Sequence, residues 1–349
     1  MKKTIKKLLL IAMAVLLIAL PLASCANESN TPDSTSASSV PSSTEATPDS
    51  SLEIKIYLLN GTTALGASKL IADAKSDADS MNYKIETFAA ADQITGAIVS
   101  GECAIAALPT NAAANLYKKS AGKIQLLAVN TLGVLYLLNN GESVTDFNSL
   151  KGKTIYLPGA GSNPEFITAA LLAANGLSAT DVTLDTTAYP SPDALTEAIA
   201  SGAAKLAVLP EPKVTVAMNK NNNIEIAMNF TTEWEEVYGK NTLAQGCLVV
   251  NTAFAKAHPA EIAKFLDDYK ASVDYVAAVT DDSINTIVSA GILPNANIAK
   301  KALPNCNICF LEGADMKSAI SVFYEKLYES NNKSIAAIPD DNFYYSRVK

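Results

Sequence analysis

DQITGAIVSGECAIAALP, residues 92–109, recurs as DALTEAIASGAAKLAVLP at residues 193–210. Nine of these 18 paired positions are identical, and two more exchange isoleucine for leucine. Upstream, the tripeptide Ile-Tyr-Leu at residues 56–58 recurs at residues 155–157. Agreement in the same order and at nearly the same offset indicates an internal duplication, because two unrelated amphipathic helices would not share it.

Each copy has the pattern of a helix followed by a buried strand. Apolar residues at the spacing of one helix face precede Gly101 and Gly202, which stand where a left-handed C-terminal cap belongs. The short apolar runs 104–108 and 205–209 are typical of strands buried on both faces of a parallel sheet. Pro109 and Pro210 are expected to end these strands.

The same order of elements extends around both copies. The first unit predicts strands at 54–59 and 85–88 with a helix through Ala74, and the second predicts strands at 154–157 and 182–185. Between these last two strands, Asn163 and Pro164 open a helix that ends at Asn175-Gly176. After a return strand at 242–250 the tail reads as helical, at 259–279, 282–290 and 314–330.

Alternation of strands and helices predicts an α/β protein with two doubly wound lobes. The tail has no counterpart in the middle unit, so we expect the chain to leave lobe one near Val134 and to return near Cys247. Lobe one then comprises residues 52–134 plus 247–349, and lobe two comprises residues 135–246. Two crossings of this kind form a hinge.

The N-terminus predicts export and a lipid anchor. Four lysines precede an apolar run of 13 residues, 8–20, which is too short to span a bilayer core of about 30 Å as a helix. We interpret residues 1–24 as a lipoprotein signal peptide and Cys25 as the lipidated residue. Ser, Thr and Pro supply 16 of the 26 residues at 26–51, so residues 25–51 read as a lipidated cysteine with a disordered tether. An ordinary signal peptide or a short signal-anchor is the alternative.

Charge and cysteine content narrow the function. The net charge of −8 becomes about −12 once the four signal lysines are removed, which argues against a nucleic-acid surface. Cys306 and Cys309 have CxxC spacing without a second pair, so no metal site is expected, and they form either a local disulfide or two buried free thiols. His258, the single histidine, stands at a helix start and suits surface capping.

Catalytic motifs are missing from the sequence. No GxSxG elbow, HExxH pair or Walker loop occurs, and Ser162 has no nearby general base. We therefore expect a binding protein without catalytic residues or a cofactor rather than an enzyme. Arg347 is the sole arginine, which disfavours a bidentate clamp on a ligand carboxylate.

The ligand site is expected where the loops of the two lobes meet. In open α/β sheets, ligands bind beyond the carboxyl ends of the strands. Matched loops that open helices there offer backbone N–H groups and hydroxyls to an anionic or carbonyl-bearing ligand. Taken singly, each loop could equally be a simple helix cap. The candidate ligand-binding residues of these two loops are Gly61, Thr62, Thr63, Gly161, Ser162 and Asn163.

Further candidates follow other strands. Thr110 and Asn111 follow the first repeated strand, Glu211 follows the second, and Asn130 and Thr131 follow a strand at 124–129. Trp234, the only tryptophan, precedes the return crossing. It could cover a ligand by stacking, and packing in the core is the alternative.

Several of these motifs resemble the NMT1/THI5-like and SsuA/TauA-like solute-binding proteins. The resemblance rests on LKGKTI at 150–155, Gly161-Ser162, LAANGL at 172–177, Asp181-Val182 and LPEP at 209–212, and it covers most of residues 52–280. It implies a type 2 periplasmic-binding fold that closes like a Venus flytrap, with an ABC permease and its ATPase as partners. Members take sulfonates, taurine, nitrate or thiamine-pyrimidine precursors.

Ligand identity does not follow from the resemblance. The loop at 108–111 is less glycine-rich than in many relatives, and His258 lies outside the expected cleft, so the family's pyrimidine-synthase activity is not carried over. We expect a monomeric, lipid-anchored subunit on the extracytoplasmic face of the cell membrane that captures a small organic anion such as a sulfonate. A thiamine-pyrimidine precursor or another heteroaromatic is the alternative ligand, and a sensory binding lipoprotein without a transport role is the alternative class.

Overall fold

The computed structural model describes residues 47–76, 81–330 and 334–347. Cys25, the signal peptide and nearly all of the tether lie outside the described residues. Within the described part, no helix combines the length and apolar character needed to cross a membrane.

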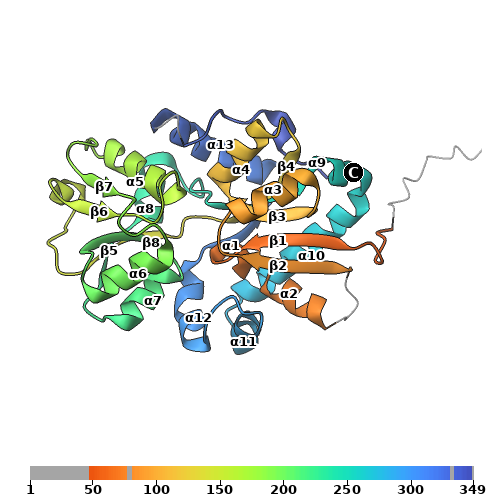
Figure 1. Ribbon diagram of the computed structural model, residues 1–349, viewed down its shortest axis with the longest axis horizontal. Coiled ribbons are helices and arrows are strands. Elements are labelled where there is room, and N and C mark those ends of the chain that lie inside the picture. Colours follow the sequence, from red (N-terminus) through yellow and green to blue (C-terminus); the bar gives the residue numbers. More distant parts are fainter. Residues whose placement is uncertain (1–46, 77–80, 331–333, 348–349) are drawn as a thin grey trace, which may run out of the picture. The chain divides into compact units, whose positions relative to one another are not determined.

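Two separate β-sheets organise the described chain (Figure 1). Four strands of the first sheet come before the second sheet in the chain and two come after it, so the chain crosses between the sheets twice. In order across the first sheet, the strands are β11 (Ile308–Leu311), β4 (Ile124–Thr131), β10 (Gly246–Asn251), β3 (Ile105–Pro109), β1 (Ile54–Leu59) and β2 (Tyr83–Phe88). Across the second they are β7 (Thr183–Asp185), β6 (Thr154–Tyr156), β8 (Leu206–Pro210), β5 (Leu135–Asn139) and β9 (Glu225–Asn229).

The duplication appears in the sheet topology. The order β2-β1-β3-β10-β4 in the first sheet matches β7-β6-β8-β5-β9 in the second. Strands β3 and β8, which the repeated sequence forms, each have one parallel and one antiparallel neighbour. Both sheets are therefore mixed rather than parallel throughout, because a strand adjoining each crossing inserts antiparallel beside the repeated strand. The α/β fold with two lobes is confirmed, and we call the elements around the first and second sheets lobe one and lobe two.

Helices flank both sheets. Gly101 and Gly202 adopt left-handed φ values of 83° and 81° at the C-terminal caps of α3 and α6, as the repeat predicts. The helices are α1 (Thr62–Leu65), α2 (Ser68–Lys75), α3 (Asp92–Ser100), α4 (Thr110–Lys119), α5 (Asn163–Ala174), α6 (Pro192–Ser201), α7 (Lys213–Lys220), α8 (Phe230–Tyr238), α9 (Thr252–Ala257), α10 (Pro259–Ala277), α11 (Asp281–Ser289), α12 (Ala296–Ala302) and α13 (Gly313–Ser330). Short 3₁₀ helices are η1 (Phe147–Leu150), η2 (Leu303–Asn305) and η3 (Asp341–Phe343).

Some element boundaries differ from the sequence expectations. The N-cap of α5 is Ser162 rather than Asn163, and Asn163 lies inside the helix with its side chain turned to other partners. The return strand starts at Gly246, four residues later than expected. His258 occupies the N-cap position of α10, but its side chain makes no capping hydrogen bond.

The cysteines of the described chain are free thiols. Cys306 donates a hydrogen bond from its Sγ to the carbonyl of Ala302 at 3.2 Å, and the Sγ of Cys309 lies 3.6 Å from the carbonyl of Val129. Burial raises the pKa of the Cys309 thiol to about 12, so it stays protonated at neutral pH. Of the two alternatives left open by the sequence, free thiols match the structure.

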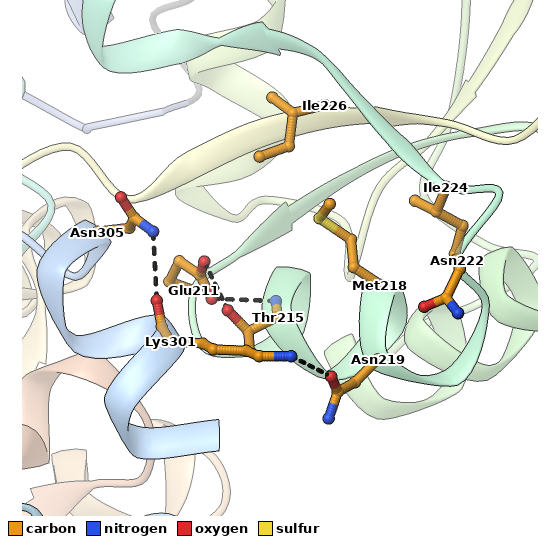
Figure 2. Close-up of a pocket in the computed structure, with 9 residues that line it drawn as sticks. All are labelled: Glu211, Thr215, Met218, Asn219, Asn222, Ile224, Ile226, Lys301 and Asn305. Carbon is orange, nitrogen blue, oxygen red and sulfur yellow. Dashed lines mark hydrogen bonds between the residues drawn. The ribbon is translucent and has the colours of Figure 1, made fainter. Parts of the chain in front are cut away.

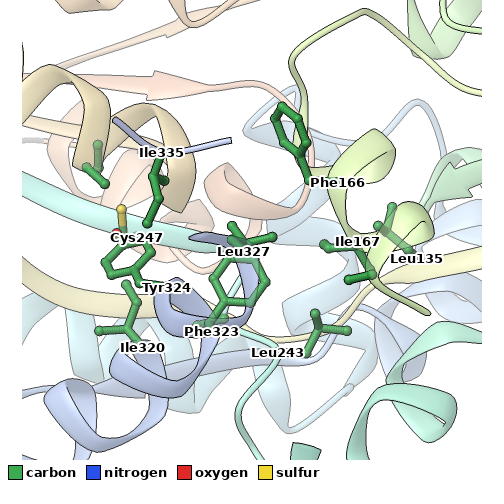
Figure 3. Close-up of a cluster of buried hydrophobic side chains, with 14 of the residues drawn as sticks. Leu135, Phe166, Ile167, Leu243, Cys247, Ile320, Phe323, Tyr324, Leu327 and Ile335 are labelled. Carbon is green, nitrogen blue, oxygen red and sulfur yellow. The ribbon is translucent and has the colours of Figure 1, made fainter. Parts of the chain in front are cut away.

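Helix α13 packs against both lobes, which the sequence did not suggest. Phe323 and Leu327 of α13 lie in one buried cluster with Phe166 and Ile167 of α5, a lobe-two helix (Figure 3). Tyr324 of α13 donates a hydrogen bond to the carbonyl of Thr110 at 2.8 Å. The tail therefore contributes apolar contacts across the boundary between the lobes.

Candidate functional site

A pocket of about 220 Å³ lies where the strand ends of the two sheets meet. We call it the interlobe pocket. Lobe one contributes the segment after β1 and the ends of β3 and β4, while lobe two contributes the start of α5 and the segment after β8. The lining residues are Leu59, Asn60, Gly61, Thr62, Thr63, Ala89, Pro109, Thr131, Val134, Leu135, Asn163, Pro164, Pro192, Pro210, Glu211, Pro212, Lys213, Gln245 and Gly246. Carboxyl ends of strands are the usual ligand-binding edge of open α/β sheets.

The interlobe pocket brings together half of the residues singled out from the sequence. Its lining includes six of the twelve candidates, namely Gly61, Thr62, Thr63, Thr131, Asn163 and Glu211. Asn111, Gly161 and Ser162 line a neighbouring pocket of about 520 Å³ between α3, α4 and the start of α5, which we call the α4 pocket. The two pockets share Asn163, so they adjoin at the start of α5.

Thr110 and Asn130 lie behind the pocket surface. Thr110 is completely buried and donates from its Oγ1 to the carbonyl of Ala244 at 2.7 Å. Asn130 donates from its Nδ2 to the carbonyl of Thr63 at 3.2 Å and to the hydroxyl of Tyr269 at 3.1 Å. Both side chains support the pocket wall, and neither belongs to its lining.

Trp234 lies in the core and not in the interlobe pocket. Its side chain is 0% exposed, and its Nε1 donates to Thr242 Oγ1 at 3.1 Å. Ring contacts to Tyr238 and Phe323 have centroid separations of 4.5 and 5.5 Å. Of the two alternatives that the sequence left open for Trp234, packing in the core matches the structure, because the apolar face of α8 turns it toward Phe323 of α13.

The segment 60–63 after β1 is held in place by its own main chain. Gly61 has a φ of 110°, a value that favours glycine, and this lets the chain turn from β1 into α1. Thr63 donates from its Oγ1 to the carbonyl of Leu59 at 2.7 Å. No side chain donates to or accepts from Thr62 within the described residues, so its hydroxyl is available to a ligand.

Asn163 connects the two lobes. Its Nδ2 donates to the main-chain carbonyl of Gln245 at 3.1 Å and approaches Thr110 Oγ1 at 3.4 Å. Its Oδ1 is buried and has no hydrogen-bond partner. A buried acceptor without a partner costs free energy, so a ligand or water donor at this point of the pocket would be stabilised.

Gln245 ties the two crossings together. Its Oε1 accepts from the main-chain N–H of Val134 on the outgoing crossing at 2.7 Å. Its own N–H donates to the carbonyl of Thr131 at 2.9 Å. Gln245 is not among the residues predicted from the sequence, and its position just before the return strand is the only signal that marks it there.

Glu211 is a buried carboxyl group at the edge of the interlobe pocket. It is 2% exposed, and it accepts hydrogen bonds from the main-chain N–H of Thr215 at 3.1 Å and from Thr215 Oγ1 at 3.0 Å. Burial raises the pKa of Glu211 to about 7, although both hydrogen bonds favour the ionised form. The group therefore changes charge near neutral pH.

Lys213 is the one cationic residue of the interlobe lining in the described chain. It follows the Glu211-Pro212 pair directly, and its Nζ forms an ion pair with Asp193. Lys213 is not among the binding residues predicted from the sequence. No aromatic residue belongs to this lining, and no cluster of three or more potential metal ligands occurs in the described part of the chain.

Several solved structures share the fold of this chain. An ABC transporter protein from Parabacteroides distasonis superposes with a TM-score of 0.71 at 23% identity, covering 86% of this chain and 100% of that one. The aliphatic sulphonate binding protein SsuA of Escherichia coli gives 0.69 at 14%, with 85% and 93% covered. The alkanesulfonate-binding protein SsuA of Xanthomonas axonopodis pv. citri, bound to MOPS, gives 0.62 at 17%, with 84% and 96% covered.

Sequence comparison matches a smaller part of the chain than the structural comparison does. No curated protein matches the chain. A family model described as NMT1/THI5 like matches residues 122–282, a region that contains all of the second sheet, strand β10 and both crossings. The resemblance inferred from the motifs is thereby confirmed: this chain carries an NMT1/THI5-like region within the fold of the periplasmic binding proteins.

Proposed function

We propose that the protein is the extracytoplasmic substrate-binding subunit of an ABC importer. The observation that carries the proposal is the interlobe pocket, whose lining comes from strand ends of both sheets. A solute in this pocket contacts both lobes and stabilises their closed arrangement, by no more than its difference in affinity for the closed and open states. The two crossings joined by Gln245 would serve as the hinge.

A small organic anion such as a sulfonate is the proposed ligand. Lys213 supplies a cation, Thr62 supplies a hydroxyl, and the pocket volume of about 220 Å³ suits a small solute. The carboxyl group of Glu211 has a pKa of about 7, so a fraction of the molecules carry it protonated at neutral pH. The protonated form can donate a hydrogen bond to an anion. Structures with this fold include two sulfonate-binding proteins, which agrees with this class of ligand.

A thiamine-pyrimidine precursor remains the second candidate. The observation in its favour is Glu211, because a buried carboxylate pairs well with the amino group of an aminopyrimidine. Stacking no longer supports it, since Trp234 lies in the core.

The remaining parts of the proposal come from the sequence. We infer that residues 1–24 are removed, that Cys25 carries the lipid anchor and that the body acts as a monomer without catalytic activity. Lobe boundaries at 52–134 plus 247–349 and at 135–246 are supported by the distribution of the strands between the sheets. A permease and its ATPase are the proposed partners, and failure of the protein to stimulate any permease would favour the sensory class instead.

The function is tested by isothermal titration calorimetry on the body from residue 26, which is the mature chain without its anchor residue Cys25. Ethanesulfonate and 4-amino-5-hydroxymethyl-2-methylpyrimidine are the two probes. Lys213→Met should weaken binding of ethanesulfonate about tenfold, as expected for loss of one charged hydrogen bond. Lys220→Met is the matched control, because Lys220 lies on the same helix and pairs with Glu197 but does not line the pocket.

Two outcomes would contradict the proposal. Binding of neither probe, together with stabilisation by sugars or cations alone, would remove both ligand classes. Equal losses in Lys213→Met and Lys220→Met would show that the effect comes from overall charge and not from the interlobe pocket.

A further inference from the structure

A second pocket, of about 350 Å³, lies beside α7 and adjoins the interlobe pocket at Glu211 (Figure 2). We call it the α7 pocket. Lobe two supplies one side of it from α7 and β9, and the tail supplies the other side from α12 and η2. The lining residues are Glu211, Thr215, Met218, Asn219, Asn222, Ile224, Ile226, Lys301 and Asn305. Glu211 is the only residue that lines both pockets.

The carboxyl group of Glu211 is held beside the α7 pocket by Thr215. Both of its oxygens are held by Thr215, which lines the α7 pocket and is absent from the interlobe lining. Figure 2 shows the carboxyl group of Glu211 next to Thr215. Glu211 lines the α7 pocket as well as the interlobe pocket, so a ligand in the α7 pocket can also approach its carboxyl group.

No cation of the described chain pairs with this carboxyl group. Lys301 lies in the same pocket, but its Nζ donates to Asn219 Oδ1 at 2.9 Å (Figure 2). Lys213, two residues along the chain, pairs with Asp193. A buried carboxylate without a counter-ion is costly, and a ligand cation at this position would offset that cost.

The wall opposite the carboxyl group is apolar. Met218, Ile224 and Ile226 form it, and Ile226 is 43% exposed, which makes it one of the few exposed large hydrophobic side chains in the described chain. Polar groups at the rim retain hydrogen-bonding capacity, since the side chain of Asn222 makes no hydrogen bond within the described residues. A buried acid facing an apolar wall suits a molecule with one cationic end and an apolar body.

We propose that the α7 pocket is a second ligand site, which takes a small organic cation with an ammonium or amidinium group on an apolar body. The cationic group contacts the Glu211 carboxylate, and the apolar body covers Met218, Ile224 and Ile226. An organic anion is disfavoured there because it would face the same carboxylate. The proposed cation site is additional to the interlobe capture site. It does not depend on the interlobe ligand being a sulfonate.

Binding at the α7 pocket depends on the charge of Glu211. The titratable and charged groups around Glu211 are Tyr136 of β5, Cys306 beside η2, Lys301 of α12 and Lys213 of α7. Burial raises the pKa values of Tyr136 and Cys306, so both are neutral near pH 7. Glu211 is thus the group that titrates here, and affinity for the cation should rise as pH increases through about 7.

The test is calorimetric titration of the mature body with n-butylammonium at pH 8, with n-butanol and butyrate as matched probes. We expect saturable binding of n-butylammonium only, and about tenfold weaker binding in Glu211→Gln. Ile226→Ser should also weaken it severalfold. Val237→Ser is its control, because Val237 is similarly exposed, at 47%, but lies on α8 outside the pocket. Lys301→Met should strengthen binding by removing a like charge.

Three results would overturn the proposal: no saturable binding of n-butylammonium, equal binding of n-butanol, or equal effects of Ile226→Ser and Val237→Ser. Ethanesulfonate is titrated into the same samples. If ethanesulfonate binds and n-butylammonium does not, only the second site is lost. If n-butylammonium binds and neither interlobe probe does, the proposed capture function fails and the second site stands.

Discussion

The side-chain amide of Asn163 donates a hydrogen bond to the main-chain carbonyl of Gln245 at 3.1 Å, and so joins α5 of lobe two to the segment that returns to lobe one. The same carbonyl accepts from the main-chain N–H of Thr110 at 3.1 Å. Because Gln245 also binds the outgoing crossing at Val134, one residue connects both crossings with the wall of the interlobe pocket. A movement of α5 away from the returning segment would break the hydrogen bond between Asn163 and Gln245.

Asn163→Asp should destabilise the protein. The substitution replaces the Nδ2 donor with an oxygen that faces the Gln245 carbonyl, and it places a carboxylate in a buried site. We expect a loss of about 2–4 kcal/mol in the free energy of unfolding, measured by urea denaturation. Asn223→Asp is the control, since Asn223 is exposed and its side chain makes no hydrogen bond, and the loss there should be within about 0.5 kcal/mol. Equal losses would show that Asn163 does not link the lobes.

Glu211→Gln should remove the contribution of Glu211 to the pH dependence of the free energy of unfolding. The folded state raises the pKa of Glu211 from 4.5 to about 7, so the folded state holds this proton more tightly than the unfolded chain. Its contribution is therefore fully present below about pH 4.5 and is lost as pH rises through about 7. The shift corresponds to about 3 kcal/mol. The amide of glutamine stays neutral and can still accept from Thr215.

Unfolding curves at pH 5 and pH 8 measure this difference. Wild type should lose more stability than Glu211→Gln on going to pH 8, and the variant should be the more stable of the two at pH 8. Thr215→Ser, which keeps the hydroxyl, is the control and should follow the wild type. A variant with the same pH dependence as wild type would show that Glu211 is ionised throughout.

Ethanesulfonate affinity should fall as pH rises through about 7. An ionised Glu211 repels an anion in the adjoining interlobe pocket, whereas a neutral Glu211 does not. Calorimetry at pH 6 and pH 8 should show a severalfold change in wild type and little change in Glu211→Gln. An aminopyrimidine is expected to show the opposite slope, because it gains from the carboxylate. The sign of the slope thus separates the two candidate ligand classes.

The duplication is what made the two lobes predictable. Gly101 and Gly202 stand at matching caps, and the strands that end at Pro109 and Pro210 occupy the same place in each sheet. Helix α13 shows the limit of such patterns. Its apolar face is visible in the sequence, but periodicity cannot say that Phe323 packs near α5 and Trp234, across the lobe boundary.

The candidate site was predictable only in part for the same reason. Strand-end positions identified Thr62 and Glu211, because the rule that ligands bind at carboxyl ends of strands depends on topology alone. Gln245 accepts a hydrogen bond from Asn163 through its main-chain carbonyl and contacts the outgoing crossing at Val134. Neither contact produces a recognisable sequence motif. For Trp234 the sequence left ligand stacking and core packing open, because a tryptophan suits both environments and its residue type does not decide between them.

Gly246 should be intolerant of any side chain, although its backbone has no left-handed conformation. A Cβ at this position would lie 2.7 Å from Asn130 Oδ1, 2.8 Å from Thr63 Cγ2 and 2.9 Å from Thr131 Cβ. Gly246→Ala must therefore push Thr63 and Thr131 apart at the wall of the interlobe pocket. We expect a loss of about 1–3 kcal/mol in the free energy of unfolding and weaker binding of the interlobe ligand.

Gly96→Ala is the control with the opposite sign, because Gly96 lies within α3 with no atom within 4 Å of its added Cβ. That change should stabilise the protein by about 0.5–1 kcal/mol and leave ligand affinity unchanged. If Gly246→Ala kept wild-type stability and affinity, the close approach of β10 to Thr63 would not be what shapes the pocket.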